Sequence, residues 1–256
     1  MELKPLKPYL LFDAGGTLVF PELEWMVGVA ADAGFRVTPE QLFETHCRLI
    51  YKIDKVACQT NHLSDPFPDG YPRALFSDLV QEPKILDEIV TKLKARNDLK
   101  NLWTSTYPWV GETLTKLSDM GYTMSVISNA DGRVEQILKD VNLRQYFEKI
   151  FDSTIVGFSK PDKRIFEIAL KTLDLQPPQA LYIGDVYTYD VWGANSAGLG
   201  CIQLDPLGLY DGWPGIRLPS VAELPEWLSA YPKIPENYNL RPTKEMFLTF
   251  ENQTTT

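Results

Sequence analysis

The chain has few of the side chains that build zinc sites and disulfide frameworks. Three cysteines occur among its 256 residues, at Cys47, Cys58 and Cys201, and no two of them form a CxxC pair. The two histidines, His46 and His62, have no second ligand at a useful spacing. We therefore expect neither a structural zinc site nor a disulfide scaffold. The cysteine content favours a reducing compartment.

Basic charge and long apolar runs are also scarce. The chain has 25 Lys and Arg against 34 Asp and Glu, which gives a formal net charge of −9 and a sequence pI of about 4.8. Nucleic-acid and membrane-surface partners would favour clustered Lys and Arg, so we expect neither partner. No run approaches the roughly 18 apolar residues of a membrane span, and no apolar signal segment begins the sequence. These features predict a cytoplasmic protein. They do not indicate its oligomeric state.

What the chain does contain is a strand-like apolar run that ends in a carboxylate. Residues 9–12 read Tyr-Leu-Leu-Phe and predict a buried parallel strand. Asp13 follows at the carboxyl end of this strand, where α/β folds place their chemistry. Gly15 and Gly16 allow a tight turn and the close approach of a ligand to the backbone, and Thr17 adds a hydroxyl. The segment indicates a nucleophile or metal ligand beside a phosphate-sized space.

Three further fragments place polar side chains beside apolar or helical patterns. They are the run at 122–127 that ends in Ser128 and Asn129, the segment 159–162 with Lys160 before a helical pattern, and the run at 181–183 that ends in Gly184 and Asp185, with Asp190 five residues on. Each fragment alone is common. Their occurrence together, with three of the four motifs at strand ends, indicates one active site.

With these four motifs the chain resembles the haloacid dehalogenase superfamily of aspartate-nucleophile hydrolases, most of whose members are phosphatases. The resemblance covers roughly residues 8–228 and is specific for the superfamily but not for a substrate. It rests on Asp13 to Thr17, Ser128 with Asn129, Lys160, and Gly184 and Asp185 followed by Asp190, Gly193 and Ala194.

The resemblance implies an α/β fold: a doubly wound, parallel-sheet, Rossmann-like core with an inserted α-helical cap domain over the active site. The expected domains are a core at 1–19 and 109–228, a cap at 20–108 and a C-terminal extension at 229–256. Helical spacing at 21–33, 39–55 and 83–94, interrupted by a Pro-rich loop at about 61–72, agrees with a helical insertion. From Gly111 onward helices and strands alternate, which predicts a parallel sheet. The Pro-rich tail from about Leu218 is expected to be a surface extension.

The motif residues suit the binding of a divalent cation. Mg²⁺ prefers carboxylate, carbonyl and water oxygens. The expected ligands are the carboxylates of Asp13 and Asp185 and the backbone carbonyl of Gly15. Asp190 is expected to orient a metal-bound water or Lys160 from behind the direct ligands.

The expected reaction is the transfer of a phosphoryl group from a small phosphorylated metabolite to Asp13. The resulting aspartyl-phosphate is then hydrolysed by water. Lys160 supplies positive charge to the transferring group. The Ser128 hydroxyl and the backbone amides of Ala14 and Asn129 are expected to donate hydrogen bonds to its oxygens, with Thr17 beside them.

One motif residue departs from the family pattern. In phosphatases of this superfamily the residue two positions after the nucleophile is an Asp, which acts as the general acid toward the leaving alcohol. Here it is Gly15, which cannot transfer a proton. Loss of such a group costs about 10²–10⁴-fold in rate, and the cost is largest for alkyl phosphates.

This departure leaves several functions open. The favoured interpretation is a Mg²⁺-dependent phosphatase with weak or specialised turnover. Haloacid dehalogenases also lack that Asp and need no metal, but their Gly-Asp motif is usually replaced, whereas Gly184 and Asp185 are intact here. Phosphonate-cleaving relatives require a cap lysine, for which Lys52 or Lys55 lies in about the right region. A non-catalytic phosphate- or metabolite-binding protein would bind Mg²⁺ and a phosphate analogue without forming aspartyl-phosphate.

Overall fold

The computed structural model describes residues 7–63, 65 and 67–231. The chain divides into two compact units. The first unit is formed by the described residues up to Phe20 and from Thr106 onward, and the second by those from Pro21 to Ser105. The 232–256 part of the expected C-terminal extension lies outside the described residues. No described helix has the length and apolarity that a bilayer crossing requires.

The first unit is built on a six-stranded sheet in the order β5-β4-β1-β6-β7-β8. Every pair of neighbouring strands is parallel. The strands are β1 (Tyr9–Phe12), β4 (Met124–Ser128), β5 (Ile150–Asp152), β6 (Ala180–Gly184), β7 (Gly200–Leu204) and β8 (Ile216–Leu218). β1 lies in the middle, where Phe12 is in register with both Val126 and Ile183. The carboxyl ends of β4, β1 and β6 therefore meet at one edge of the sheet.

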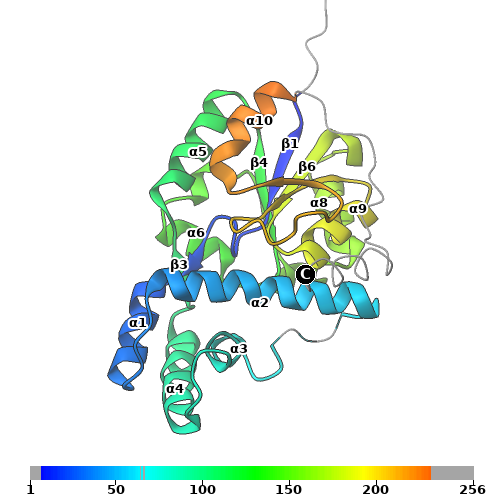
Figure 1. Cartoon of the computed structure of the whole chain (residues 1–256). Helices are drawn as coiled ribbons and strands as arrows, with labels where there is room; N and C mark the ends of the chain where they lie inside the picture. Colours follow the sequence, from blue (N-terminus) through cyan, green and yellow to red (C-terminus); the bar gives the residue numbers. More distant parts are fainter. Residues whose placement is uncertain (1–6, 64, 66, 232–256) are drawn as a thin grey trace, which may run out of the picture. The chain divides into compact units, whose positions relative to one another are not determined.

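Helices cover both faces of this sheet (Figure 1). On one face α5 (Pro108–Asp119), α6 (Val134–Asp140) and α10 (Leu224–Ala230) pack against apolar side chains of the strands. On the other face lie α8 (Lys163–Thr172) and α9 (Trp192–Ser196). The strands read as nearly continuous apolar runs because both of their faces are buried. The expected doubly wound parallel fold is confirmed.

Short helical turns complete the first unit. They are α7 (Ser153–Val156), the 3₁₀ turns Arg144–Tyr146, Pro177–Gln179 and Val221–Glu223, and the π-helical turn η3 (Tyr187–Val191). The last of these carries Asp190. The three cysteines, all within the described part of the chain, form no disulfide.

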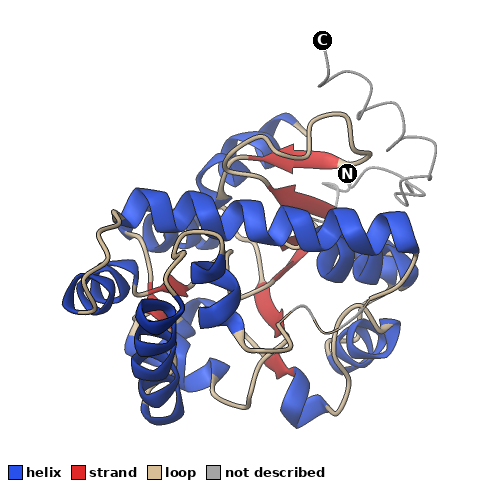
Figure 2. Cartoon of the chain, turned by 60° about the horizontal axis from the view of Figure 1, so that its bottom comes forward, coloured by secondary structure: helices blue, strands red, loops and turns tan. Residues whose placement is uncertain are grey.

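The second unit is helical. It contains α1 (Leu23–Asp32), α2 (Pro39–Thr60), α3 (Tyr71–Ser77) and α4 (Pro83–Leu99), and β2 (Phe20–Pro21) pairs with β3 (Trp103–Ser105) in a small sheet at its boundary. α2 is one uninterrupted helix (Figure 2). It begins at a capping box between Thr38 and Gln41 and ends at Asn61, which has a left-handed conformation. That this unit acts as a cap domain stays a prediction.

Some sequence expectations for these elements were wrong. The segment from Leu218 to Ala230 is not a surface extension: Val221, Leu224 and Leu228 are buried in the main core of the first unit. Proline stands in the first turn of α10, where its missing N–H costs nothing, so it begins this helix instead of breaking it. α2 and α4 also extend beyond their predicted ends, to Thr60 and Leu99.

Candidate active site

Asp13 lies directly after β1, at the centre of the sheet edge where three strands end. Its backbone N–H donates to the carbonyl of Ile183 at 2.8 Å, which extends the pairing of β1 with β6 by one residue. The residue is buried, with 6% of its surface exposed. The next residues turn sharply, because the carbonyl of Ala14 accepts hydrogen bonds from the amides of Thr17 and Leu18. The turn keeps the Asp13 carboxylate at the edge where the carboxyl ends of the strands meet.

Gly16 and Thr17 receive the side chain of Asp185, which follows β6. Gly16 has a φ of +78°, and a Cβ there would lie 2.2 Å from Oδ2 of Asp185. The buried hydroxyl of Thr17 donates to Oδ1 of Asp185 at 3.4 Å. Gly16 therefore provides both the turn and the space for this carboxylate. Thr17, expected beside the substrate, faces Asp185 in the structure.

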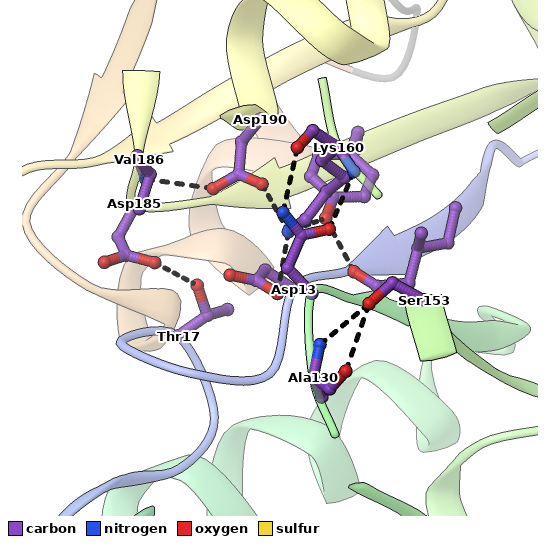
Figure 3. A network of polar contacts seen from close by, with 11 residues as sticks. Asp13, Thr17, Ala130, Ser153, Lys160, Asp185, Val186 and Asp190 are labelled. Atoms are coloured by element: carbon purple, nitrogen blue, oxygen red, sulfur yellow. Dashed lines mark hydrogen bonds and ion pairs between the residues drawn. The ribbon is translucent and has the colours of Figure 1, made fainter. Parts of the chain in front are cut away.

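Asp190 comes from η3 and completes a group of three carboxylates (Figure 3). Asp13, Asp185 and Asp190 each offer an oxygen, and these oxygens lie within 4.8 Å of one another. Oδ2 of Asp190 accepts the backbone N–H of Val186 at 2.9 Å. Its side chain lies over Gly184, where a Cβ would stand 2.4 Å from Cγ of Asp190. The glycine of this motif is therefore required by close packing.

The three carboxylates repel one another; Asp13 and Asp190 are buried, and Asp185 is half-buried. Burial, followed by the charges of Asp13 and Asp190, raises the pKa of Asp185 well above its ordinary value. Burial also raises the pKa of Asp190, to about 6, although Lys160 opposes this shift. A divalent cation would offset this repulsion, and an all-oxygen donor set suits Mg²⁺. The residues present therefore fit the expected cation.

Lys160 is the only ammonium among these carboxylates within the described chain. Its Nζ lies 2.8 Å from Oδ1 of Asp13 and 2.6 Å from Oδ1 of Asp190, and it donates to the Tyr182 hydroxyl at 2.9 Å. Burial alone would lower the pKa of this ammonium, but Asp13 and Asp190 outweigh burial and raise it. Lys160 is therefore a permanently charged, 4% exposed group beside Asp13.

Asn129 holds the backbone of Lys160. Its side-chain Oδ1 accepts from the Lys160 amide at 2.7 Å, and its Nδ2 donates to the Lys160 carbonyl at 2.9 Å. Ser128, the last residue of β4, is buried beside it. The structure thus joins Asn129, which directly follows Ser128, to Lys160 about thirty residues further along the chain, as a single site requires.

Asp152, the last residue of β5, and Ser153, which follows it, were not predicted from the sequence. The carboxylate of Asp152 accepts the backbone N–H groups of Gly132 at 3.0 Å and of Thr154 at 3.0 Å. Ser153 Oγ accepts the Ala130 amide at 3.0 Å (Figure 3). These side chains fasten the loop after Asn129 to the neighbouring strand. The sequence signal was an Asp immediately before Ser-Thr, which is typical of a helix N-cap.

In the second unit, one histidine and two basic side chains of α2 have partners of their own. His46 is buried, its Nδ1 lies 3.2 Å from the Tyr71 hydroxyl, and burial lowers its pKa to about 4. The exposed Arg48 pairs with Glu44 at 2.7 Å on the same helix. Lys52 lies 3.7 Å from Asp78. His46, Arg48 and Lys52 therefore have structural partners within the second unit.

Comparison with known proteins gives a family match over half of the chain. The model for "haloacid dehalogenase-like hydrolase" matches residues 73–204. The human haloacid dehalogenase-like hydrolase domain-containing protein 3 is 37% identical over 120 residues, which are 44% of this chain and 47% of that protein. Glyceraldehyde 3-phosphate phosphatase of Methanopyrus kandleri is 30% identical over 48% of this chain and 52% of its own length. The chain spans about half the length of the curated relatives it matches.

Solved structures share the fold over most of the chain. A crystal structure described as a dehalogenase covers 88% of this chain and 99% of its own, with a TM-score of 0.59 and 23% identity. A HAD phosphatase from Thermococcus onnurineus covers 89% of this chain and all of its own, with a TM-score of 0.54 and 22% identity. At these identities the likeness shows the fold alone.

Proposed function

The chain belongs to the haloacid dehalogenase-like hydrolases, and from this premise we propose that it is a metal-dependent phosphatase that acts through an aspartyl-phosphate on Asp13. The observation that carries the proposal is the juxtaposition at one sheet edge of Asp13, two further carboxylates within 4.8 Å and the ammonium of Lys160 at 2.8 Å. Relatives named as phosphatases of glyceraldehyde 3-phosphate and of phosphoglycolate support a small phosphorylated metabolite as the substrate. The low cysteine content supports a cytoplasmic setting.

The divalent cation is proposed to be Mg²⁺. Asp13, Asp185 and the backbone carbonyl of Gly15 would hold it, and Asp190 would support them through Lys160. When bound, the cation neutralises the charged oxygens of the phosphoryl group so that an anionic carboxylate can approach phosphorus. The intact Gly184 and Asp185 motif favours this function over a 2-haloacid dehalogenase, in which by family resemblance that motif is usually replaced and no metal is needed.

The chain's own residues then carry the transfer. An oxygen of Asp13 forms a bond to phosphorus while the bond from phosphorus to the leaving oxygen breaks, and water supplies the proton that the leaving group takes. Water next attacks phosphorus, and the bond to Asp13 breaks to release inorganic phosphate. The charge of Lys160 stabilises the transferring group. The Ser128 hydroxyl and the amides of Ala14 and Asn129 donate to its oxygens.

Gly15 limits which substrates react well. Its position offers no proton to an alkoxide, so an alkyl phosphate reacts slowly. Acyl and aryl phosphates have leaving groups that depart without a proton and are less affected. We therefore propose weak or specialised turnover, with the unit from Pro21 to Ser105 acting as the substrate-selecting cap.

The test is hydrolysis of acetyl phosphate and p-nitrophenyl phosphate by the purified protein, with Mg²⁺ and with EDTA. We expect release that needs Mg²⁺ and is lost in Asp13→Asn. Asp140→Asn, which changes an exposed carboxylate at the end of α6, should leave the rate unchanged. Metal-dependent activity that survives in Asp13→Asn would refute the nucleophile assignment. No release above background would refute the phosphatase and make 2-haloacids and phosphonoacetaldehyde the next substrates.

A further inference from the structure

Tyr182 is a fully buried polar residue of β6 that the proposed reaction does not use. Its hydroxyl donates to the backbone carbonyl of Ile127 at 2.9 Å and accepts from Lys160 at 2.9 Å. The ring packs edge to face against Phe166 of α8, with the ring centroids 5.2 Å apart. The hydroxyl is therefore fixed by its ring on one side and by a backbone carbonyl on the other.

The position of this hydroxyl follows from the strand order. β1 lies between β4 and β6, and Tyr182 is in register with Leu11 of β1. Its hydroxyl nevertheless bonds to Ile127 of β4, so the side chain reaches across β1 on the face that carries α8 and Lys160. The carbonyl that it reaches belongs to the residue before Ser128. Tyr182 thus joins three of the strands that bring the motif residues together.

The ammonium of Lys160 has its full set of partners only when Tyr182 is counted. A lysine ammonium has three hydrogens to donate. It donates to Oδ1 of Asp190 at 2.6 Å and to the hydroxyl of Tyr182 at 2.9 Å, and it forms an ion pair with Oδ1 of Asp13 at 2.8 Å. Two of these three partners are carboxylates that surround the expected cation. Only the hydroxyl is neutral and anchored independently of the carboxylate cluster.

We propose that Tyr182 is a positioning residue: its hydroxyl fixes the Lys160 ammonium in the orientation in which the ammonium contacts Asp13 and Asp190. Its effect on catalysis rests on the proposed function, because Lys160 matters for turnover only if a phosphoryl group is transferred at Asp13. Its effect on the geometry of Lys160 does not depend on turnover. The two effects can therefore be measured separately.

The catalytic effect is tested with Tyr182→Phe, which removes the hydroxyl and keeps the ring. With p-nitrophenyl phosphate and Mg²⁺ we expect kcat to fall about tenfold, the size expected for one hydrogen bond to a charged group, while KM changes less than about twofold. Tyr9→Phe is the matched control, because Tyr9 bonds Ser125 at 2.7 Å at the opposite end of β1; its kcat should stay at the wild-type value. A Tyr182→Phe variant with wild-type kcat would overturn the proposal.

The geometric effect is tested by NMR of lysine Nζ groups labelled with ¹⁵N. A buried ammonium that is held by hydrogen bonds exchanges slowly with water, and the signal is assigned by its absence in Lys160→Met. In Tyr182→Phe we expect exchange at least about tenfold faster, and in Tyr9→Phe no change. Unchanged exchange in Tyr182→Phe would overturn the proposal even if that variant were less active.

These readouts separate the two proposals. If the wild-type protein hydrolyses nothing, the proposed function fails, and the NMR exchange rates alone decide whether Tyr182 positions Lys160. If Tyr182→Phe does not fold, the proposal is tested by NMR on the wild-type protein. A nuclear Overhauser contact between the Lys160 ammonium hydrogens and the Tyr182 ring supports the proposal, since Nζ lies 5.5 Å from the ring centroid. The lack of that contact would overturn it.

Discussion

At the scale of single residues, the two adjacent glycines after Asp13 have different physical roles. Gly16 has a φ of +78° and is pressed against Asp185, so its lack of a side chain is a steric requirement. The backbone of Gly15 does not have a positive φ. A side chain at position 15 is therefore compatible with the backbone, whereas one at position 16 is not. The glycine that removes the family's usual acid is the one that can be changed.

The requirement at position 16 predicts the effect of Gly16→Ala. The added methyl group would lie 2.2 Å from Asp185 Oδ2 and displace that carboxylate, so Mg²⁺ affinity should fall at least about tenfold, as measured by isothermal titration calorimetry. Gly34→Ala is the matched control, because Gly34 has a φ of +86° with nothing within 4 Å of its added Cβ. Both variants should lose about 1 kcal/mol of stability from the positive φ. Wild-type Mg²⁺ affinity in Gly16→Ala would contradict the arrangement.

The freedom at position 15 allows the missing acid to be restored. In Gly15→Asp, hydrolysis of an alkyl phosphate such as glycerol phosphate should rise at least about tenfold, because the leaving alkoxide gains a proton donor. Gly15→Asn has nearly the same shape and cannot donate a proton as an acid, so it should show no gain. Steady-state rates with Mg²⁺ make the comparison. Equal rates in the Asp and Asn variants would mean that proton donation does not limit turnover.

At the scale of elements, the site depends on how loops are tied to strand ends. The loop after β4 carries Asn129, and it is bound to the end of β5 through the side chains of Asp152 and Ser153. Asn129 in turn holds the backbone of Lys160, in the loop that leads to α8. A chain of side-chain-to-backbone hydrogen bonds therefore runs from β5 to Lys160.

This arrangement predicts a large effect for Asp152→Ala. The substitution leaves the amides of Gly132, Val134 and Thr154 without their side-chain acceptor, so the free energy of unfolding should fall by about 2 kcal/mol in urea titrations. Asp131→Ala, in the same loop, removes an exposed ion pair with Arg133 and should change stability by less than about 0.5 kcal/mol. Similar losses in the two variants would show that the Asp152 hydrogen bonds do not fix this loop.

The elements that the sequence predicts best are the central strands, because burial on both faces leaves an unbroken apolar run. The same property is the reason that the role of Tyr182 was not predicted, because within an apolar run it resembles any other large buried residue. Only the structure shows that its hydroxyl contacts Lys160 and the carbonyl of Ile127. α10 was missed because the proline of its first turn was taken as a mark of irregular structure. The four motif segments were predicted from local patterns. Their partners Tyr182 and Asp152 were not, because those contacts depend on which strands are neighbours.

At the scale of the whole molecule, the two units differ in the ionisable groups that they bury. The first unit buries an ammonium among carboxylates around Asp13, whereas the second unit buries the imidazole of His46 together with the side chain of Asp54. The pKa of His46 is lowered from 6.5 to about 4 by burial. Above pH 6.5 His46 is neutral whether the unit is folded or unfolded. As the pH falls from 6.5 toward 4, only the unfolded state takes up the proton, so stability decreases.

The predicted loss for the second unit is about 3 kcal/mol between pH 6.5 and pH 4. Hydrogen exchange of α2 amides, corrected for the intrinsic pH dependence of exchange, measures this loss within that unit. In His46→Gln the decrease should be smaller by that amount. His62→Gln changes an exposed histidine and should behave like the wild type. A pH dependence that is the same in all three proteins would contradict the buried neutral state of His46.

Chemical trapping of Asp13 during turnover is the sharpest test of the proposed aspartyl-phosphate. Protein mixed with acetyl phosphate and Mg²⁺ is quenched and treated with borohydride, which reduces an acyl phosphate to an alcohol, and the peptide containing Asp13 is analysed by mass spectrometry. We predict that Asp13 is converted to homoserine with Mg²⁺ and is unchanged with EDTA. Phosphate release without any conversion at Asp13, or conversion at a different carboxylate, would contradict the account.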